Sequence, residues 1–294
     1  MLVSGARGFL GRHLVRRLRR AGADVHAVTR HLTGPADGGL SWHEVDLTDA
    51  GATEELLERV RPDVVMHLAS RVQGHREPDL VLPMLEANTQ AAISVMDAAR
   101  RLPGCRVVLA GSVEEPGPGE APVSPYAAAK AATTGYARLY HDQWELPVTV
   151  LRLSMVYGPD QPDDRKLVPS AAQAMLAGEV PALSSGGRGI DWVYIDDVCD
   201  AFLLAATRPD APGAVVEIGS GRAVTVADTV RALADSCDYT GPLGFGDMDD
   251  RTHDVAHVAD PAPAQRLLGW RPRTPLADGL ARTARWYAGD APAG

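Results

Sequence analysis

The stretch Gly5-Ala6-Arg7-Gly8-Phe9-Leu10-Gly11 is the most informative part of this chain for its fold, because it stands between a short apolar run and a helical pattern. Its three glycines are spaced three residues apart. Glycines at this spacing let a strand turn tightly into a helix and let backbone N–H groups approach a pyrophosphate. The N-terminus of the helix then faces the anion. The stretch therefore predicts a strand, a turn and a helix that bind a dinucleotide.

Short apolar runs alternate with helical patterns along the first half of the chain, which indicates a parallel sheet covered by helices. Because each step from strand to helix to parallel strand closes right-handed, we expect an α/β fold with a doubly wound parallel Rossmann sheet. The predicted strands cover residues 1–4, 24–29, 42–46, 63–69, 106–111 and 148–153. The predicted helices lie near residues 10–21, 54–60, 80–101 and 125–144.

The second half of the chain is less regular, with proline and glycine clusters at residues 159–162 and 184–189 that mark loops. Helices are predicted near residues 167–177, 225–236 and 276–287. We expect residues 1–154 to form the nucleotide-binding Rossmann domain. Residues 155–294 are expected to form mainly a smaller C-terminal substrate-binding lobe, with some segments returning to the Rossmann core.

The composition is that of a globular protein, with 45% hydrophobic and 23% charged residues among 294. A net charge of −9 argues against a nucleic-acid partner, which would need a basic surface. Three cysteines without a CxxC pair, and no HExxH, predict neither disulfides nor a metal site and fit a reducing compartment. No apolar stretch approaches the roughly 18 residues of a membrane span, and the N-terminal strand leaves no room for a signal peptide. We therefore expect a cytoplasmic protein with no membrane, nucleic-acid or metal partner.

A second motif, Tyr126-Ala-Ala-Ala-Lys130, lies on a predicted helix, where the spacing of four residues puts both side chains on one face. An ammonium beside a phenol favours the phenolate, so we expect Lys130 to lower the pKa of Tyr126. Ser112 ends a predicted strand upstream, and its hydroxyl could hold a substrate carbonyl beside the tyrosine. The alternative is an ordinary amphipathic helix with an exposed lysine. Against that alternative, Lys130 is one of only two lysines in the chain.

Further motifs follow in order along almost the whole chain. They are Asp46-Leu47, His67-Leu68-Ala69 with Ser70, Asn88, and residues 152–159, 191–198 and 268–272. Together with the glycine stretch and the set of Ser112, Tyr126 and Lys130, they resemble the extended short-chain dehydrogenase/reductases, also called the NAD-dependent epimerase/dehydratase family. The resemblance implies that Asp46 meets the adenine amino group and that Asn88 supports the cofactor.

By that resemblance Tyr126 is the general acid or base, Lys130 tunes it and binds the ribose, and Ser112 polarises the substrate oxygen. The nicotinamide exchanges a hydride with the carbon that bears this oxygen, while the protein sets the geometry. Helices at residues 80–101 and 125–144 pair across a dimer interface in many relatives, so we expect a homodimer. The implied cofactor residues are Gly5, Arg7, Gly8, Phe9, Leu10, Gly11, Arg30, Asp46, Leu47, Leu68, Ala69, Ser70, Asn88, Tyr126 and Lys130.

The end of the second predicted strand bears on the choice of nicotinamide cofactor. NAD sites of this kind place an acidic residue there to hold the ribose 2′-hydroxyl. Here the strand ends in Val28-Thr29-Arg30-His31, without a carboxylate. Arg30, and Arg7 within the glycine stretch, could instead bind a 2′-phosphate. We therefore favour NADP over the alternative, NAD, although an arginine-rich chain places arginines at many positions.

A nucleotide-sugar is the expected substrate class. The chain keeps only some of the residues with which relatives of this family bind such a substrate. Met155 stands where relatives often carry Asn, and Ile190 stands where they often carry Arg. Arg188 could substitute for that arginine, and Arg251 resembles a second arginine that binds the diphosphate. Arg188 and Arg251 are the candidate substrate residues.

The residues after Ser112 bear on the reaction. Dehydratases of this family follow Ser or Thr with an acidic pair, whose Glu takes the C5 proton. Glu114 stands at that Glu position, so it is a possible catalytic residue, but Val113 replaces its acidic partner. A solvated loop is the alternative for Glu114 and Glu115.

We expect NADPH-dependent reduction of a 4-keto-6-deoxy nucleotide-sugar. The alternatives are an epimerase or 4,6-dehydratase with internal hydride return, and a non-catalytic NADP-binding sensor.

Overall fold

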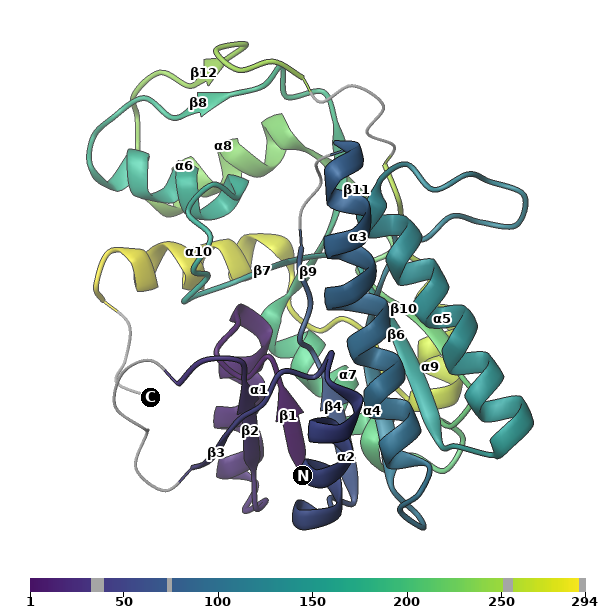
Figure 1. Ribbon diagram of the computed structural model, residues 1–294. Helices are drawn as coiled ribbons and strands as arrows, with labels where there is room; N and C mark the ends of the chain where they lie inside the picture. Colours follow the sequence, from purple (N-terminus) through teal and green to yellow (C-terminus); the bar gives the residue numbers. More distant parts are fainter. Residues whose placement is uncertain (33–39, 73–75, 251–255, 291–294) are drawn as a thin grey trace. The chain divides into compact units, whose positions relative to one another are not determined.

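The computed structural model describes residues 1–32, 40–72, 76–250 and 256–290, and its largest element is a seven-stranded sheet (Figure 1). The strands are β1 (Leu2–Ser4), β2 (His26–Thr29), β3 (Ser41–Glu44), β4 (Val64–His67), β5 (Arg106–Ser112), β6 (Val148–Leu153) and β10 (Val215–Ile218). Their order is β10-β6-β5-β4-β1-β2-β3, and the registers from β3 across to β6 are all parallel. The direction of winding reverses between β1 and β4, where such a sheet opens a crevice at the carboxyl ends of its strands. The predicted doubly wound α/β fold is confirmed.

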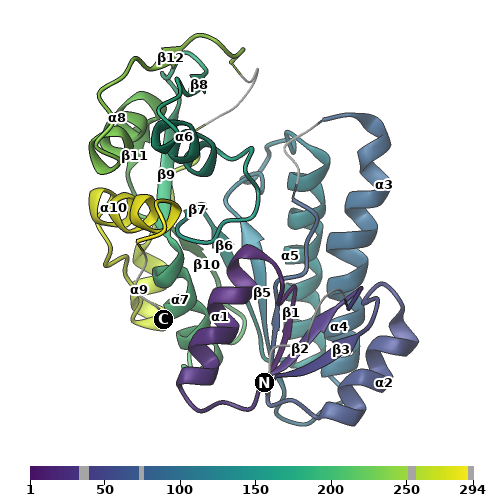
Figure 2. The ribbon, with the colours of Figure 1, turned by 90° about the vertical axis from the view of Figure 1, so that its left-hand side faces the viewer.

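Helices cover both faces of this sheet. They are α1 (Phe9–Arg20), α2 (Ala50–Val60), α4 (Ala91–Ala99), α5 (Pro125–Trp144), α7 (Ile195–Thr207) and α9 (Ala262–Leu268). Figure 2 shows α2, α4 and α5 on one face of the sheet and α1 and α7 on the other. The start of α5 is set by Ser124, whose hydroxyl accepts the N–H of Ala127, and by Pro125, which favours the first helical position.

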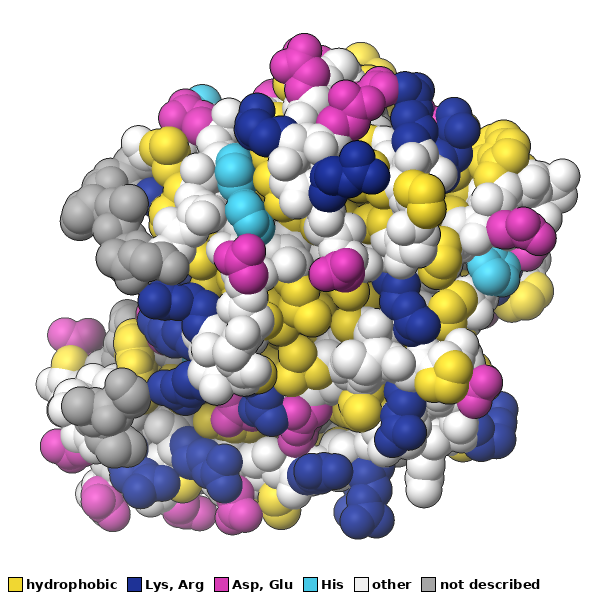
Figure 3. All heavy atoms as spheres, turned by 90° about the horizontal axis from the view of Figure 1, so that it is seen from below, with side chains coloured by type: hydrophobic (Ala, Val, Ile, Leu, Met, Phe, Trp, Pro, Cys, Tyr) yellow, Lys and Arg dark blue, Asp and Glu magenta, His cyan; other side chains and the backbone are white. Residues whose placement is uncertain are grey.

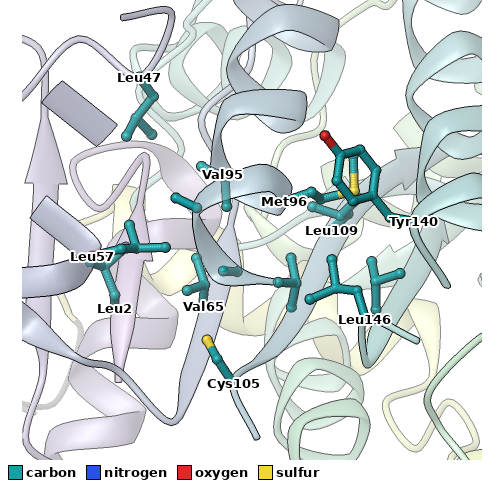
Figure 4. Close-up of a cluster of buried hydrophobic side chains, with 14 of the residues drawn as sticks. Leu2, Leu47, Leu57, Val65, Val95, Met96, Cys105, Leu109, Tyr140 and Leu146 are labelled. Atoms are coloured by element: carbon teal, nitrogen blue, oxygen red, sulfur yellow. The ribbon is translucent and has the colours of Figure 1, made fainter. Parts of the chain in front are cut away.

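The core between the sheet and helices α4 and α5 draws on the same face of successive strands (Figure 4). Leu2, Val65 and Leu109, from β1, β4 and β5, are all buried. Val95 of α4 and Tyr140 of α5 belong to the same buried cluster. Burying a large aliphatic side chain contributes roughly 1.5–3 kcal/mol, so this packing holds the strand ends at fixed positions.

The region predicted to be helical near residues 80–101 consists of four consecutive helical segments. They are η1 (Pro78–Leu80), α3 (Val81–Met84), the π-helical turn η2 (Leu85–Gln90) and α4. Pro83 lies within α3, where it lacks an N–H to donate and its ring crowds the preceding turn. The π turn widens the helix directly after it and carries Asn88. The predicted helical stretch near residues 80–101 is therefore confirmed, and the π turn in its middle is a feature that the sequence did not predict.

The chain divides into two compact units. The first is Met1–Leu153 with Cys199–Glu217 and Ala262–Trp270, and the second is Ser154–Val198 with Ile218–Pro261 and Arg271–Gly294. The strands of the second unit are β7 (Met155–Tyr157), β9 (Gly189–Tyr194) and β11 (Ala223–Thr225) in one sheet and β8 (Ala182–Leu183) and β12 (Gly244–Phe245) in another. Its helices are α6 (Leu167–Leu176), α8 (Val226–Ser236) and α10 (Leu276–Tyr287).

Buried Asp191 ties the loops of the second unit together. Its carboxylate accepts hydrogen bonds from the backbone N–H groups of Ser220, Gly221 and Ala259 and from the Ser220 hydroxyl. A buried charge is tolerated only when its lone pairs are satisfied in this way. Asp191 is therefore a structural anchor of the second unit.

Surface charges of both signs are mixed on the face drawn in Figure 3, where Lys and Arg side chains are interspersed with Asp and Glu side chains. Among the residues that the structure describes, no helix combines the length and apolar character that crossing a membrane requires. Within the same residues, no group of three or more His, Cys, Asp or Glu side chains is arranged to hold a metal ion.

Candidate active site

The glycine turn between β1 and α1 depends on close backbone approaches. Gly5 has φ +65°, and a Cβ there would stand 2.7 Å from the Ala69 backbone nitrogen. A Cβ on Gly11 would stand 2.1 Å from the Gly5 carbonyl oxygen. No larger residue fits either position without moving backbone. The turn thus brings the start of α1 against the loop that follows β4.

A cavity of about 350 Å³ lies beside this turn. The predicted cofactor residues that line it are Gly5, Arg7, Gly8, Arg30, Asp46, Leu47, Ala69 and Ser70. The predicted residues that do not line it are Phe9, Leu10, Gly11, Leu68, Asn88, Tyr126 and Lys130. Apolar walls from Val28, Val45 and Leu47, together with the N-terminus of α1, suit the adenosine diphosphate part of a nicotinamide dinucleotide.

The carboxylate of Asp46 is held in place on the cavity wall. Its Oδ1 accepts hydrogen bonds from the backbone N–H and the hydroxyl of Thr48, at 3.0 and 2.9 Å. The backbone hydrogen bond is the main reason that the pKa of Asp46 lies below its ordinary value, and Arg30 lowers it further. Asp46 therefore presents a negative charge, which suits a contact with an amino group.

Two arginines contribute positive charge to the cavity. Arg30 follows β2 directly and is exposed. The Arg7 guanidinium lies 4.8 Å from the centre of the Trp42 ring, on β3, within the range of a cation–π contact. Both side chains line the cavity, as the sequence predicts.

Ser4 fixes the loop after β4, a role that sequence reasoning did not find. Its hydroxyl oxygen accepts the N–H groups of Leu68 and Ala69, both at 3.1 Å, and the hydroxyl is hydrogen-bonded to Nδ1 of His67 at 2.9 Å. Burial, and next the charge of Lys130, lower the pKa of His67 to about 3. His67 is therefore neutral near pH 7. The signal in the sequence is a serine that ends the otherwise apolar β1.

Asn88 is hydrogen-bonded to the loop that lines the cavity. Its Oδ1 accepts hydrogen bonds from the Ser70 hydroxyl and the Arg71 backbone N–H, both at 2.8 Å, and its Nδ2 donates to the Arg71 carbonyl. The loop that carries Ser70 and Arg71 lines the cavity, whereas Asn88 itself is buried away from it. Asn88 is therefore a scaffold for the cavity wall.

Ser112, Tyr126 and Lys130 form a second cluster, at the end of β5 and the start of α5. Each of the three is less than 9% exposed. The Lys130 Nζ donates to the Ala110 carbonyl at 2.7 Å and lies 5.7 Å from the centre of the Tyr126 ring. The Ser112 side chain is hydrogen-bonded to Tyr126. The interpretation of Lys130 as an exposed lysine on an amphipathic helix is wrong.

The pKa of Tyr126 is raised above its ordinary value, contrary to the expectation that Lys130 lowers it. Burial is the largest cause, because it disfavours the phenolate, and the charge of Glu114 adds to it. Lys130 is buried as well, and burial lowers its own pKa to about 8. With a pKa of about 8, Lys130 has lost its charge before Tyr126 ionises, so it cannot favour the phenolate there.

The two glutamates after Ser112 have different surroundings. Glu115 is buried, and its carboxylate accepts the Ser112 N–H and contacts the Arg152 guanidinium. The alternative of a solvated loop is therefore wrong for Glu115. Glu114 donates its backbone N–H to the Ser112 hydroxyl oxygen at 3.2 Å, and its charge reaches Tyr126. The contact between Glu115 and Arg152 is possible because Arg152, on β6, lies beside Gly111 of β5.

The two candidate substrate residues belong to the second unit. Arg188 is half-buried in the turn before β9, and its carbonyl accepts the Val226 N–H. Arg251 lies outside the described residues.

Comparisons with known proteins agree with this fold. The family model for the NAD dependent epimerase/dehydratase family matches residues 1–219. A dTDP-glucose 4,6-dehydratase from Streptomyces antibioticus is 32% identical, with 98% of this chain and 92% of the relative covered. The UDP-glucose 4-epimerase of Thermotoga maritima, solved with UDP-glucose, is 26% identical with a TM-score of 0.88, covering 97% of each chain. The UDP-glucose 4-epimerase of Thermus thermophilus, solved with NAD, is 26% identical with a TM-score of 0.84, covering 98% of each chain.

Proposed function

This chain is an enzyme of the NAD-dependent epimerase/dehydratase family, and on that premise we propose that it reduces a 4-keto-6-deoxy nucleotide-sugar with NADPH. The observation that carries the proposal is the buried cluster of Ser112, Tyr126 and Lys130. Because burial raises the pKa of Tyr126, the phenol keeps its proton at neutral pH. A protonated phenol suits the protonation of a carbonyl oxygen, which is the proton step of a reduction.

The residues of the cluster divide the proton chemistry between them. The cofactor, when bound, would supply the hydride for the carbonyl carbon. Ser112 Oγ donates a hydrogen bond to the carbonyl oxygen, and Tyr126 Oη gives that oxygen its proton, so the product is an alcohol at C4. Lys130, with a pKa lowered to about 8, can exchange a proton near neutral pH and lies over the Tyr126 ring. Val113 offers no acid to expel a C6 hydroxyl, which argues against dehydration.

NADP rather than NAD is the proposed cofactor because of the charges around the cavity. Arg30 follows β2 where an NAD site would carry a carboxylate, and Arg7 lies on the same cavity wall. Guanidinium groups bind phosphate with paired hydrogen bonds, so these arginines suit a 2′-phosphate. Residues 155–294, with Arg188 and Arg251, are proposed to bind the nucleotide-sugar.

The second candidate is an epimerase or 4,6-dehydratase that returns the hydride to its own substrate. The names of the relatives favour it, as does the NAD held by the Thermus thermophilus enzyme. The test is a 4-keto-6-deoxy sugar nucleotide with NADPH deuterated at the transferable position. Reduction consumes one NADPH for each product, with deuterium at C4. Turnover of an unoxidised sugar nucleotide without net change at 340 nm, and without label, would establish internal return instead.

We also propose that two copies of the chain associate through α3, η2 and α5. Large apolar side chains are exposed there, namely Val81, Leu82, Leu85, Tyr136 and Leu139. Grouped apolar exposure of this kind is typical of an interface. Light scattering after gel filtration should give twice 31.2 kDa, and Leu82→Glu should give one chain.

The free thiols of all three cysteines suit the reducing cytoplasm as the site of action.

A further inference from the structure

The side chain of Glu115 is fully buried, although it belongs to a loop rich in proline and glycine. Its Oε1 accepts the backbone N–H of Ser112 at 2.9 Å. Its Oε2 contacts both Nε and Nη2 of Arg152, each at 2.9 Å. The partners of this carboxylate are thus Ser112, which is proposed to hold the substrate carbonyl, and the charged Arg152 on the next strand.

We propose that Glu115 and Arg152 are a positioning pair, which orients the Ser112 hydroxyl and sets the charge around Lys130. The inference rests on the roles proposed above for Ser112 and Lys130. Neither member of the pair needs to touch the substrate, because each acts through the backbone turn that carries Ser112.

The turn that the pair closes determines where the Ser112 hydroxyl points. The Glu115 backbone N–H donates to the Ser112 carbonyl at 3.2 Å, while the Glu115 side chain accepts the Ser112 N–H. Closed in this way, the turn directs the Glu114 N–H to Ser112 Oγ at 3.2 Å. Because Oγ accepts from the backbone, its own proton is left for an oxygen of the site, which is that of Tyr126 when no substrate is bound. The pair thereby prepares Ser112 to act as a donor.

The β-sheet register and one glycine make room for the pair. Arg152 lies opposite Gly111 in the pairing of β5 with β6. A Cβ on Gly111 would stand 2.7 Å from Glu115 Oε1 and 3.3 Å from Arg152 Cγ. The absence of a side chain at Gly111 lets the carboxylate fold back over the strand and reach the guanidinium.

The charge of Glu115 also reaches the two proton-handling residues. It raises the pKa of Lys130, which burial lowers, and adds to the rise in the pKa of Tyr126. The other groups that face Lys130 are the Ala110 carbonyl, the Tyr126 ring and neutral His67. Tyr126 also faces Glu114 and Ser112. Arg152 offsets the negative charge of Glu115, so removing Arg152 should strengthen the effect of Glu115 on Lys130.

The test exploits the two lysines of the chain. With ¹³Cε-labelled lysine, NMR gives one titrating signal for Lys130 and one for Lys166, which serves as an internal reference. In Glu115→Gln the titration midpoint of Lys130 should fall by about one pH unit, because a nearby negative charge is lost. In Arg152→Met the midpoint should rise, because the charge of Glu115 is no longer offset. The Lys166 signal should titrate alike in all proteins.

Kinetics give the second readout. Glu115→Gln should lower kcat by roughly tenfold to hundredfold, as loss of an orienting partner typically does, while the Kd for NADPH stays unchanged. Glu120→Gln is the matched control, because exposed Glu120 also accepts a backbone N–H three residues earlier, from Gly117. The control should resemble the wild type.

Opposite shifts of Lys130 in the two variants support the pair. Shifts in the same direction, or none, would overturn it, since a purely structural role predicts no dependence on the sign of the removed charge. The double variant Glu115→Gln/Arg152→Met, which carries no net change of charge, covers the case in which Arg152→Met does not fold. Its Lys130 midpoint should lie near that of the wild type. The NMR result does not depend on turnover, so it separates failure of this inference from failure of the proposed reaction.

Discussion

The proton of Tyr126 is controlled by groups that act in opposite directions. Burial and the charges of Glu114 and Glu115 raise its pKa, while the hydrogen bond from Ser112 lowers it. A single hydroxyl therefore depends on three neighbours, all of which belong to the segment of residues 112–115.

We predict that Tyr126→Phe keeps the fold and the cofactor affinity, because it removes one hydroxyl from a residue that does not line the cavity. Turnover should fall by ~10²–10⁴-fold, the usual loss for a general acid. Steady-state kinetics and a fluorescence titration with NADPH measure the two quantities. Near-normal turnover would remove Tyr126 from the mechanism.

Arg30 is the residue at which the choice of cofactor can be tested. A hydrogen bond to a charged group contributes roughly 1.5–3 kcal/mol, so Arg30→Ala should weaken NADPH by about tenfold to hundredfold. NADH has no phosphate to lose and should change little. Arg20→Ala, at the last turn of α1, removes the same charge away from the cavity and serves as the control. Equal losses of affinity for NADPH and NADH in Arg30→Ala would count against NADP.

At the scale of the element, α5 carries Tyr126 and Lys130 in its first turns and depends on its N-cap. Ser124→Ala removes the hydroxyl that accepts the Ala127 N–H at 3.1 Å. We predict a loss of about 1 kcal/mol in the free energy of unfolding, measured by urea denaturation. Ser124→Thr keeps a capping hydroxyl and should retain most of the stability. If both variants unfold at the same urea concentration, the cap is not what stabilises this end of α5.

The elements show which parts of the fold the sequence could predict. The helical and apolar patterns of the sequence predicted helices near residues 125–144 and 276–287 and a strand at 148–153, and the structure has these elements at the same bounds. The strands β7, β9 and β10 and the helix α7 were missed. β7 has only three residues, too few for a period, and tertiary pairing rather than local pattern determines such elements. The sequence motifs likewise identified Ser112, Tyr126 and Lys130 but not Ser4 or the pair of Glu115 with Arg152, since these contacts join residues far apart in the chain.

At the scale of the whole molecule, the buried His67 makes stability depend on pH. Its pKa is about 3 in the folded chain, whereas an unfolded histidine has a pKa near 6.5. Between these values the unfolded state binds one more proton, so the free energy of unfolding falls as the pH falls. His43 has a lowered pKa as well and acts in the same direction.

We predict that acidification below about pH 6.5 removes about 1.4 kcal/mol of stability per pH unit through His67. In His67→Asn this contribution is absent, so the slope between pH 6 and pH 4 should be shallower by about that amount. Chemical denaturation at a series of pH values measures both slopes. Identical slopes in the two proteins would contradict a buried neutral His67.

The central sheet has a consequence for how the protein is made. Its outermost strand β10 and the helix α9 come from segments Cys199–Glu217 and Ala262–Trp270, which a ribosome adds long after Met1–Leu153 has emerged. Until then β6 is an open edge, free to pair with the strands of other nascent chains. A chain released after residue 153 should therefore accumulate in inclusion bodies, because β6 stays unpaired at this edge until β10 has been synthesised.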